Sequence, residues 1–506
     1  MNDAMSEHTH PNPALHALRE RWSVIADLQQ SVSLLTWDAR TYLGSAGHQR
    51  RARGIATLTR LRHEHLADGE LGDLLADLEG TDLVGDDAAL VRECRREVHR
   101  AQRLPGALVA RAAQQFALAE HRWARARSDD DFASFAPVLR ENFVIAREFA
   151  QALAPDTHAY DALHDQYERD STAVDVERLF APVRTELRDL SSEIAARGPR
   201  DDSVLRQRFD RALQARFATE VIEAFGFDPA RGRLDATTHP FATGITRDDV
   251  RITTRYADDD LRVALFSTMH EAGHGIYEQY LPEAYAGTPL GGTVSLGVHE
   301  SQSRLFENLI GRSLPFWEWA FDRLRAVFPH QLAGVDGPTF HRAINIVTPS
   351  FIRVEADEVT YHLHVMLRFE LEQALLDGSL DVDDLPGAWN ERSLAYLDVA
   401  PPDDRRGCLQ DVHWAAGLIG YFPTYTIGTL LSVQLWEALR RDLGDVDGAI
   451  RRGEFSGIRT WLTERVHEQG RRATPHELTL AATGAPLSAA PFLRYVREKY
   501  GALYEL

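Results

Sequence analysis

Apolar residues recur at steps of three and four through almost all of this 506-residue chain. The first such run passes from Leu15 through Trp22 to Leu35, a spacing that places apolar side chains on one face of an α-helix. Alternation with a period of two is almost absent, so we predict an all-α protein. Further helices are predicted around residues 52–79, 86–127, 133–154, 173–197, 203–225, 261–280, 300–330, 338–376, 384–398, 414–443, 446–469 and 489–504.

One segment departs from the helical spacing. Residues 249–256, DVRITTRY, contain β-branched side chains such as Val250 and Ile252, which favour a short strand or an extended edge segment. No stretch resembles a linker, and no repeat of fixed period is present. We therefore expect one folded domain over 13–506, preceded by a polar, proline-containing segment, 1–12, that should fray.

Composition limits the partners and the compartment. A net charge of −20 repels nucleic-acid phosphates and anionic lipid, so we expect neither nucleic acid nor a membrane as a partner. The chain has no apolar run of about 20 residues, and its start lacks the basic flank and apolar segment of a secretory signal. Its two cysteines, Cys94 and Cys408, are expected to be packing groups, which favours a reducing cytoplasm.

The segment STMHEAGHGIYEQY carries two histidines four residues apart, with a glutamate directly after the first. On a helix, His270 and His274 would project from one face and could chelate one ion, while Glu271 could reach an activated water as general base. Roughly 0.06 such motifs are expected by chance in a chain of this kind, so a metal site is favoured over a helix that merely carries two imidazoles. Gly273 and Gly275 thin the helix where other backbone or a substrate would approach.

A catalytic zinc needs a third protein ligand, and this helix and the next offer four candidates. Glu278 should point past the ion as a surface charge, and Glu307 falls in the middle of the following helix. His299 and Glu300 stand in the first turn of that helix, after a glycine-rich bend that lets it pack back on the first. Glu300 is favoured and His299 is the alternative, because local sequence does not decide which of two adjacent side chains faces inward.

Six motifs occur in a fixed order along the chain. They are HPF at 239–241, DVRIT at 249–253, HEAGH at 270–274, HESQ at 299–302, IRVEAD at 352–357 and GCLQDVHW at 407–414. With LLTWD near the start and REKYGALYEL at the end, the chain resembles the thermostable carboxypeptidase Taq family of metallocarboxypeptidases over nearly its full length.

This resemblance implies an all-helical fold with a deep central groove, similar to that of neurolysin and angiotensin-converting enzyme. It also implies a homodimer that removes single residues from peptides with a free C-terminus. By motif, His270, His274 and Glu300 would hold one Zn²⁺ per chain, with Co²⁺ or Mn²⁺ as possible replacements, and Glu271 would be the general base.

An exopeptidase must also bind the terminal carboxylate, for which a planar bidentate guanidinium is well suited. The resemblance gives this role to Arg353, assisted by a tyrosine of GYFPTYTIG. Tyr425 is favoured over Tyr421 because its distance from Arg353 in the sequence resembles the family spacing. Arg251 is a second candidate, and Asp357, four residues after Arg353, could orient the guanidinium or simply stabilise a helix.

The remaining candidates lie in the motifs QDVHW and HPF. His413 could donate to the developing oxyanion or to the leaving amine, with Gln410 and Asp411 orienting it or contacting the peptide. His239 could contact the substrate or make a structural hydrogen bond. Trp414 is expected to be a core aromatic residue.

Two rival functions use the same motif. One is an endo-acting oligopeptidase of the same fold, and the other is a metal-stabilised, peptide-binding protein without turnover. Glu271 argues against the second, because a structural zinc site fills its fourth position with protein and needs no base.

Overall fold

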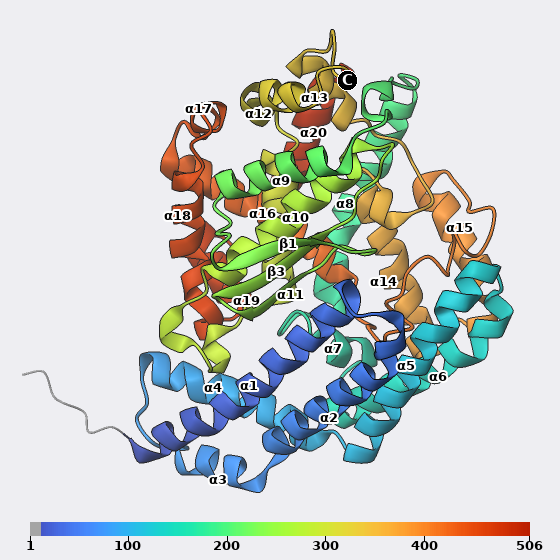
Figure 1. The fold of residues 1–506 in the computed structure, drawn as a ribbon. Coiled ribbons are helices and arrows are strands. Elements are labelled where there is room, and N and C mark those ends of the chain that lie inside the picture. The colour runs from blue at the N-terminus through green and yellow to red at the C-terminus, as the bar shows by residue number, and fades with distance from the viewer. Residues whose placement is uncertain (1–11) are drawn as a thin grey trace, which may run out of the picture.

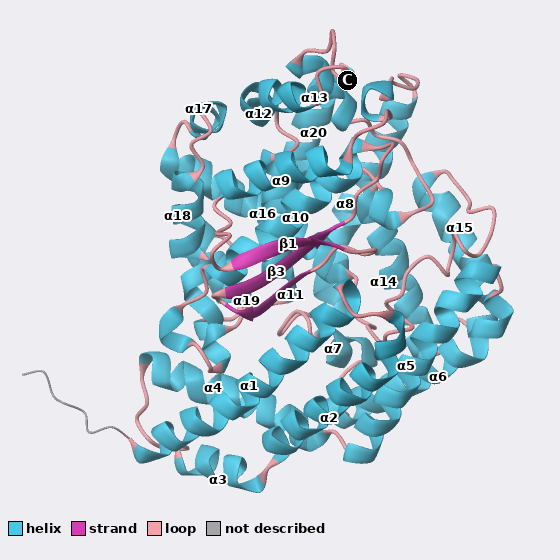
Figure 2. Ribbon diagram, in the orientation of Figure 1, coloured by secondary structure: helices cyan, strands magenta, loops and turns pink. Residues whose placement is uncertain are grey.

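The computed structural model describes residues 12–506, whose regular secondary structure is helical apart from one small sheet (Figure 2). This confirms the all-α prediction. The segment predicted to fray lies outside the described residues except for Asn12, whose side chain accepts a hydrogen bond from the Ala14 N–H and caps the first helix. The described part of the chain contains no helix long and apolar enough to span a membrane.

The α-helices are α1 (Pro13–Thr41), α2 (His48–Ala67), α3 (Gly69–Asp77), α4 (Gly85–Arg103), α5 (Gly106–Asp129), α6 (Phe132–Leu153), α7 (Ala159–His164), α8 (Ala173–Ala195), α9 (Arg211–Phe225), α10 (Leu261–Gln279), α11 (Leu296–Arg304), α12 (Leu314–Val327), α13 (Gly337–Ile344), α14 (Tyr361–Asp377), α15 (Leu385–Leu397), α16 (Pro423–Leu443), α17 (Val446–Arg451), α18 (Ser456–Arg465), α19 (Pro475–Thr483) and α20 (Ala490–Tyr504). A π-helical turn, Leu305–Ile310, extends α11.

Some long predicted helices are divided in the structure. The helix predicted over 338–376 is wrong because residues 345–360 leave the helical path between α13 and α14, where Pro349 disfavours a helical conformation of the residue before it. The helix predicted over 86–127 is two helices, and Pro105 caps the second of them. The short helices α7 and α19 were not predicted, because two turns show little periodicity.

The sheet has three strands, β1 (Gly232–Ala236), β2 (Ala242–Thr246) and β3 (Asp249–Thr254), in the order β1-β3-β2. β3 pairs parallel with β1 and antiparallel with β2. The strand predicted at 249–256 is therefore confirmed, but it is the central strand and not an edge segment. β1 and β2 were missed because neither shows a clear alternation of apolar and polar residues.

Helices from distant parts of the sequence meet around this sheet (Figure 1). α10 contacts β2, β3, α9 and α11. The contact between α11 and α16 is the most extensive one between two elements of the described residues. α14 and α16 are buried over most of their surfaces, as expected of helices at the centre of a large core. A smaller hydrophobic cluster joins α1, α3 and α4 to Tyr285 and Leu290. The single domain and the deep central groove stay predictions.

Candidate active site

Two glycines let α10 lie directly between α11 and the sheet. A Cβ atom on Gly273 would lie 2.5 Å from the carbonyl oxygen of Gln302, and one on Gly275 would lie 2.8 Å from Cγ2 of Ile252. Both separations are shorter than any normal van der Waals contact. The close approach predicted from these glycines is confirmed, and it brings the face of α10 that carries both histidines against α11.

His270, His274 and Glu300, here called the metal cluster, converge at this contact. The Nε2 atoms of His270 and His274 lie 3.5 and 3.4 Å from Oε2 of Glu300. One ligand atom from each of the three residues lies within 4.8 Å of the others. A tetrahedral ion with ligands at about 2.0–2.1 Å separates its ligand atoms by roughly 3.3 Å. The spacing and the two-nitrogen, one-oxygen donor set therefore fit a divalent cation such as zinc.

Outer hydrogen bonds orient both imidazoles toward Glu300. Nδ1 of His274 donates to the carbonyl oxygen of His299 at 3.1 Å, and Nδ1 of His270 donates to Oε2 of Glu307 at 2.9 Å. These bonds place the ring proton on Nδ1 and leave the Nε2 lone pair directed at the metal cluster. Burial and the neighbouring His299 lower the pKa of His274 to about 3, so this imidazole is neutral, as a metal ligand must be.

Glu300, and not His299, completes the metal cluster. The His299 ring stacks on the His274 ring with centroids 4.3 Å apart, and its Nε2 lies 2.9 Å from Oε1 of Glu278. The Glu278 side chain is only 20% exposed because it is paired with His299. The prediction that Glu278 is a surface charge is therefore wrong. Glu278 accepts from a histidine of another helix, α11, so helical spacing along α10 could not predict this role.

The position of Glu300 is fixed from two sides. Nε of Arg304 donates to Oε1 at 2.7 Å, and Oγ of Ser303 donates to Oε2 at 3.0 Å. On the opposite side α16 crosses so closely that a Cβ on Gly428 would lie 2.5 Å from Cβ of Glu300. Burial raises the pKa of Glu300, but the charges of Arg304 and His270 outweigh it and hold that pKa well below its usual range. Glu300 is therefore an ionised carboxylate.

Sequence reasoning missed the roles of Arg304 and Glu307. Glu307 lies in the π-helical turn and accepts from His270, and Nη1 of Arg304 donates to its Oε2 at 3.1 Å. Together with Glu300 these residues are spaced by four and three positions, which places them on one helix face. That pattern is the signal from which the second carboxylate could have been found.

Glu271 is a buried carboxylate with an unused acceptor. Its side chain is 6% exposed, and its Oε2 has no hydrogen-bond partner among residues 12–506. Burial raises the pKa of Glu271 to about 7. A carboxylate with this pKa, directly after a residue of the metal cluster, can both accept and return a proton near neutral pH.

Arg353 forms a second buried group, the arginine cluster, with Asp411 and Tyr361. Nε and Nη2 of Arg353 donate to Oδ1 of Asp411 at 3.2 and 2.8 Å, and Nη1 donates to Oη of Tyr361 at 2.9 Å. A guanidinium has five N–H groups, so two remain for another acceptor. Asp411 also accepts from Nε of Arg368 at 2.7 Å, so one carboxylate is shared by two buried guanidinium groups.

Of the two roles considered for Asp357, the pairing with Arg353 is wrong. Residues 353–355 form a short 3-10 turn, so positions four apart do not face each other. Asp357 instead accepts from the backbone N–H groups of Thr348 and Thr360 and so holds the turn that leads into α14.

An aromatic group adjoins the arginine cluster. The Arg353 guanidinium carbon lies 4.9 Å from the centre of the Tyr425 ring, and Oη of Tyr425 lies 2.9 Å from Nε2 of His413. The centre of the Tyr421 ring lies 5.4 Å from the centre of the His413 ring and 5.4 Å from that of the Tyr425 ring. Burial and the charge of Arg353 lower the pKa of His413 to about 3, so His413 is neutral.

Arg304 joins the metal cluster to the arginine cluster. Its guanidinium carbon lies 4.3 Å from the centre of the Tyr361 ring, and its Nε holds Glu300. The charge of Glu300 is also among the influences that raise the pKa of Tyr421 and Tyr425, after burial. One arginine thus contacts the third residue of the metal cluster and the tyrosine that orients Arg353.

Three predicted substrate contacts lie elsewhere or are already engaged. The Gln410 side chain is bonded to backbone groups, including the Arg353 N–H at 2.9 Å, which favours a positioning role. Arg251 pairs with Asp249 and lies 4.4 Å from the Trp37 ring. His239 is exposed in the β1–β2 loop. Neither Arg251 nor His239 contacts the two clusters, and their substrate roles stay predictions. Trp414 and both cysteines are buried, as expected.

Comparison with known proteins identifies the family. Residues 17–500 match the sequence model of the carboxypeptidase Taq (M32) metallopeptidases. The chain is 45% identical to thermostable carboxypeptidase 1 of Thermus thermophilus over 98% of this chain and 99% of that one. It is 37% identical to carboxypeptidase 1 of Bacillus subtilis over 99% of this chain and all of that one.

Solved structures agree with this assignment. The crystal structure of an M32 carboxypeptidase from Deinococcus radiodurans superposes with a TM-score of 0.95 at 40% identity, covering 98% of this chain and 100% of that one. A Pyrococcus furiosus carboxypeptidase superposes with a TM-score of 0.94 at 36% identity, covering 97% and 99%. The matches in sequence and in fold span nearly the whole of both chains. The protein therefore belongs to the carboxypeptidase Taq (M32) family of metallopeptidases.

Proposed function

We propose that this metallocarboxypeptidase uses zinc to remove single residues from peptides with a free C-terminus. The observation that carries the proposal is the connection, through Arg304, of a two-histidine, one-glutamate cluster to a buried arginine with two uncommitted N–H groups. The first arrangement suits hydrolysis of a peptide bond, and the second suits recognition of a carboxylate. An enzyme that binds the terminal carboxylate at Arg353 while it hydrolyses a peptide bond at the metal cluster acts at the C-terminal peptide bond.

His270, His274 and Glu300 would hold the ion. Neutral imidazole nitrogens and a carboxylate oxygen are the donors of a catalytic zinc site, and Co²⁺ or Mn²⁺ accept the same set. When bound, the ion supplies a Lewis acid that lowers the pKa of water and polarises a carbonyl.

The side chains divide the remaining work. Glu271 removes a proton from the attacking water and passes it to the departing amine, which its pKa of about 7 permits. Arg353 binds the terminal carboxylate with its two remaining N–H groups, and Tyr425 assists beside it. His413, neutral and hydrogen-bonded to Tyr425, donates to the developing oxyanion or to the leaving amine. Tyr421 packs behind both and shapes the site.

We also infer a homodimer in the cytoplasm. The family resemblance supports the dimer, and the two unpaired, buried cysteines, Cys94 and Cys408, are suited to a reducing compartment. Light scattering of the purified protein tests the dimer directly: a mass near twice the 56.9 kDa chain supports it, and the monomer mass refutes it.

Paired peptides test the proposed activity. The metal-reconstituted protein is incubated with one peptide as the free acid and as the C-terminal amide, and products are followed by mass spectrometry. We expect a ladder that loses one residue at a time from the free acid and almost no cleavage of the amide. Internal cleavage of both peptides would favour an endo-acting oligopeptidase, and metal-dependent binding without cleavage would favour a binding protein.

The carboxylate contact is tested by Arg353→Lys, which keeps the positive charge opposite Asp411 but loses the planar fork. We expect KM for free-acid peptides to rise at least about tenfold, since a charge-assisted, two-point contact becomes a single one. An unchanged KM would remove Arg353 from substrate recognition.

A further inference from the structure

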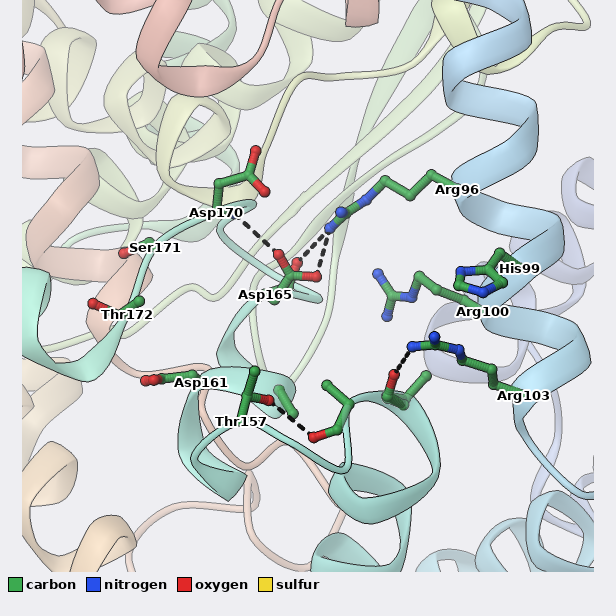
Figure 3. A pocket seen from close by; sticks show the side chains of 13 residues that line it. Arg96, His99, Arg100, Arg103, Thr157, Asp161, Asp165, Asp170, Ser171 and Thr172 are labelled. Carbon is green, nitrogen blue, oxygen red and sulfur yellow. Dashed lines mark hydrogen bonds and ion pairs between the residues drawn. The ribbon is translucent and has the colours of Figure 1, made fainter. Parts of the chain in front are cut away.

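A cavity of about 440 Å³ lies between α4 and the segment 153–172 (Figure 3). None of its lining residues belongs to the metal cluster or to the arginine cluster. One wall is a basic face of α4, and the other carries three aspartates and the hydroxyl groups of Thr157 and Ser171. The basic wall consists of Arg96, His99, Arg100 and Arg103.

The carboxylates of this cavity are already engaged. Asp165 accepts from Nη2 of Arg96 at 2.7 Å and from a backbone N–H of its own loop at 3.0 Å. Asp161 accepts from the N–H of the first residue of α8 at 2.7 Å. The carboxylate of Asp170 lies 3.2 Å from Nε of Arg169. Asp165 and Asp170 are thus each paired with an arginine, whereas Asp161 is held by a neutral N–H.

The guanidinium of Arg100 is uncommitted in the described chain. Within residues 12–506 no hydrogen bond or ion pair engages its guanidinium, which points into the cavity (Figure 3). Arg100 is half-buried, and burial lowers its pKa, while the charge of Glu97 one turn earlier on α4 opposes that shift. The hydroxyl of Ser171 also has no hydrogen-bond partner in the described chain. A planar donor fork with free N–H groups is suited to a carboxylate.

One loop separates this cavity from the candidate active site. Tyr167 follows Asp165 of the cavity wall, and its ring lies edge-on to the Tyr421 ring with centroids 5.1 Å apart. Its carbonyl oxygen accepts from the N–H of Leu296 at the start of α11, the helix of Glu300. The charge of Arg100 is among the influences on the pKa of Tyr167, although burial dominates and raises it. The cavity therefore adjoins the wall of the site on the side of the tyrosines.

We propose that this cavity is a substrate subsite in which Arg100 binds the carboxylate of an aspartate or glutamate in the peptide. The inference rests on the proposed function, which places the C-terminal residue at Arg353, so any other subsite binds residues upstream of it. A chain with a net charge of −20 repels acidic peptides, and a local cation is needed to accept them. Arg100 gives the enzyme a preference for peptides with an acidic residue at one upstream position.

A position scan tests this subsite. Free-acid peptides carry a single glutamate moved one position at a time away from the C-terminus, and each is compared with the same peptide bearing glutamine. With the wild-type enzyme we expect glutamate to raise kcat/KM about tenfold at one or two adjacent positions, chiefly through KM, as a charge-assisted hydrogen bond does. The Arg100→Gln variant should lose this preference, so that its kcat/KM for each glutamate peptide matches its kcat/KM for the glutamine peptide of the same position.

Two further variants make the result specific. Arg95→Gln removes the same charge from the same helix, but Arg95 donates to the Leu75 carbonyl away from the cavity, so its glutamate preference should remain. Arg100→Lys keeps the charge and should retain part of the preference, which also covers the case in which Arg100→Gln fails to fold. Equal preference in the wild type and in Arg100→Gln would overturn the subsite.

The remaining outcomes separate this inference from the proposed function. If no peptide is hydrolysed by metal-loaded wild-type protein, the proposed function fails first. If all peptides are hydrolysed without dependence on glutamate position, only the subsite fails. The thermal transition is also measured with inorganic phosphate: stabilisation of the wild type but not of Arg100→Gln, without a glutamate preference, would assign the cavity to a small anion and refute the peptide subsite.

Discussion

The hydrogen bond from His270 to Glu307 allows the sharpest test of how the metal cluster is held. Replacing Glu307 by Gln keeps an acceptor of nearly the same shape opposite Nδ1 of His270, which lies 2.9 Å from Oε2. The substitution removes the negative charge that orients the imidazole and makes it a better ligand. It also removes one of the two carboxylates paired with Arg304, whose Nη1 lies 3.1 Å from the same oxygen and whose Nε stays bonded to Glu300.

The size of the effect follows from this geometry. A hydrogen bond to a charged group contributes about 1.5–3 kcal/mol and a neutral one about 0.5–1.5 kcal/mol, so about 1–1.5 kcal/mol of ligand orientation is lost. That difference corresponds to roughly tenfold in a dissociation constant. Loss of imidazole basicity adds to it, and outer-shell substitutions at metal sites commonly weaken binding about 10- to 100-fold. We therefore expect the Glu307→Gln variant to bind Zn²⁺ about 10- to 100-fold more weakly.

The assay is a competition titration of the metal-free protein against a chelator of known affinity, with the thermal transition of the metal-free variant recorded separately. Glu278→Gln is the matched control, because Glu278 also lies 2.9 Å from a histidine nitrogen, that of His299, which is outside the metal cluster. The control should change zinc affinity less than about twofold, within the range of an indirect contact. Unchanged affinity in Glu307→Gln, or an equal loss in Glu278→Gln, would refute the reasoning.

Two further substitutions test the packing and the buried charge. Gly428→Ala should lower the free energy of unfolding by about 1–3 kcal/mol and weaken metal binding, because its Cβ would lie 2.5 Å from Glu300. Gly457→Ala in α18, where nothing lies within 4 Å, should be neutral or stabilise by up to about 1 kcal/mol, and equal melting temperatures for the two variants would contradict this. Burial raises the pKa of Glu372 from 4.5 to about 8, so its contribution to stability is complete below pH 4.5 and is lost as the pH rises toward 8. Glu372→Gln should therefore show a smaller fall in melting temperature between pH 5 and pH 8 than the wild type, and parallel curves would argue against a neutral Glu372.

Spacing along the sequence predicts only the part of the site that lies on a single helix, α10. His270 and His274 are four residues apart, so helical geometry alone places them together, and the structure agrees. The choice between His299 and Glu300 depends on where α16 crosses α11 at Gly428, far along the chain. No property of the local sequence encodes that crossing.

The arginine cluster shows the same limit. Asp357 is the local candidate partner of Arg353, but the true partner, Asp411, lies 58 positions away in the sequence. The helix predicted through Arg353 is interrupted near Pro349, which removes the expected i, i+4 geometry. The strands β1 and β2 were missed for a related reason, since they are stabilised by pairing with β3 and not by their own pattern.

The most direct test of the account is the rate of peptide hydrolysis per bound metal ion in the Glu271→Gln variant. Glu271 is outside the metal cluster, and its Oε2 has no hydrogen-bond partner in the described chain, so the variant should load zinc as the wild type does. Loss of a general base slows hydrolysis about 10²- to 10⁴-fold, and we predict a loss in this range at full metal occupancy. A fully loaded variant that hydrolyses free-acid peptides within tenfold of the wild-type rate would contradict the account.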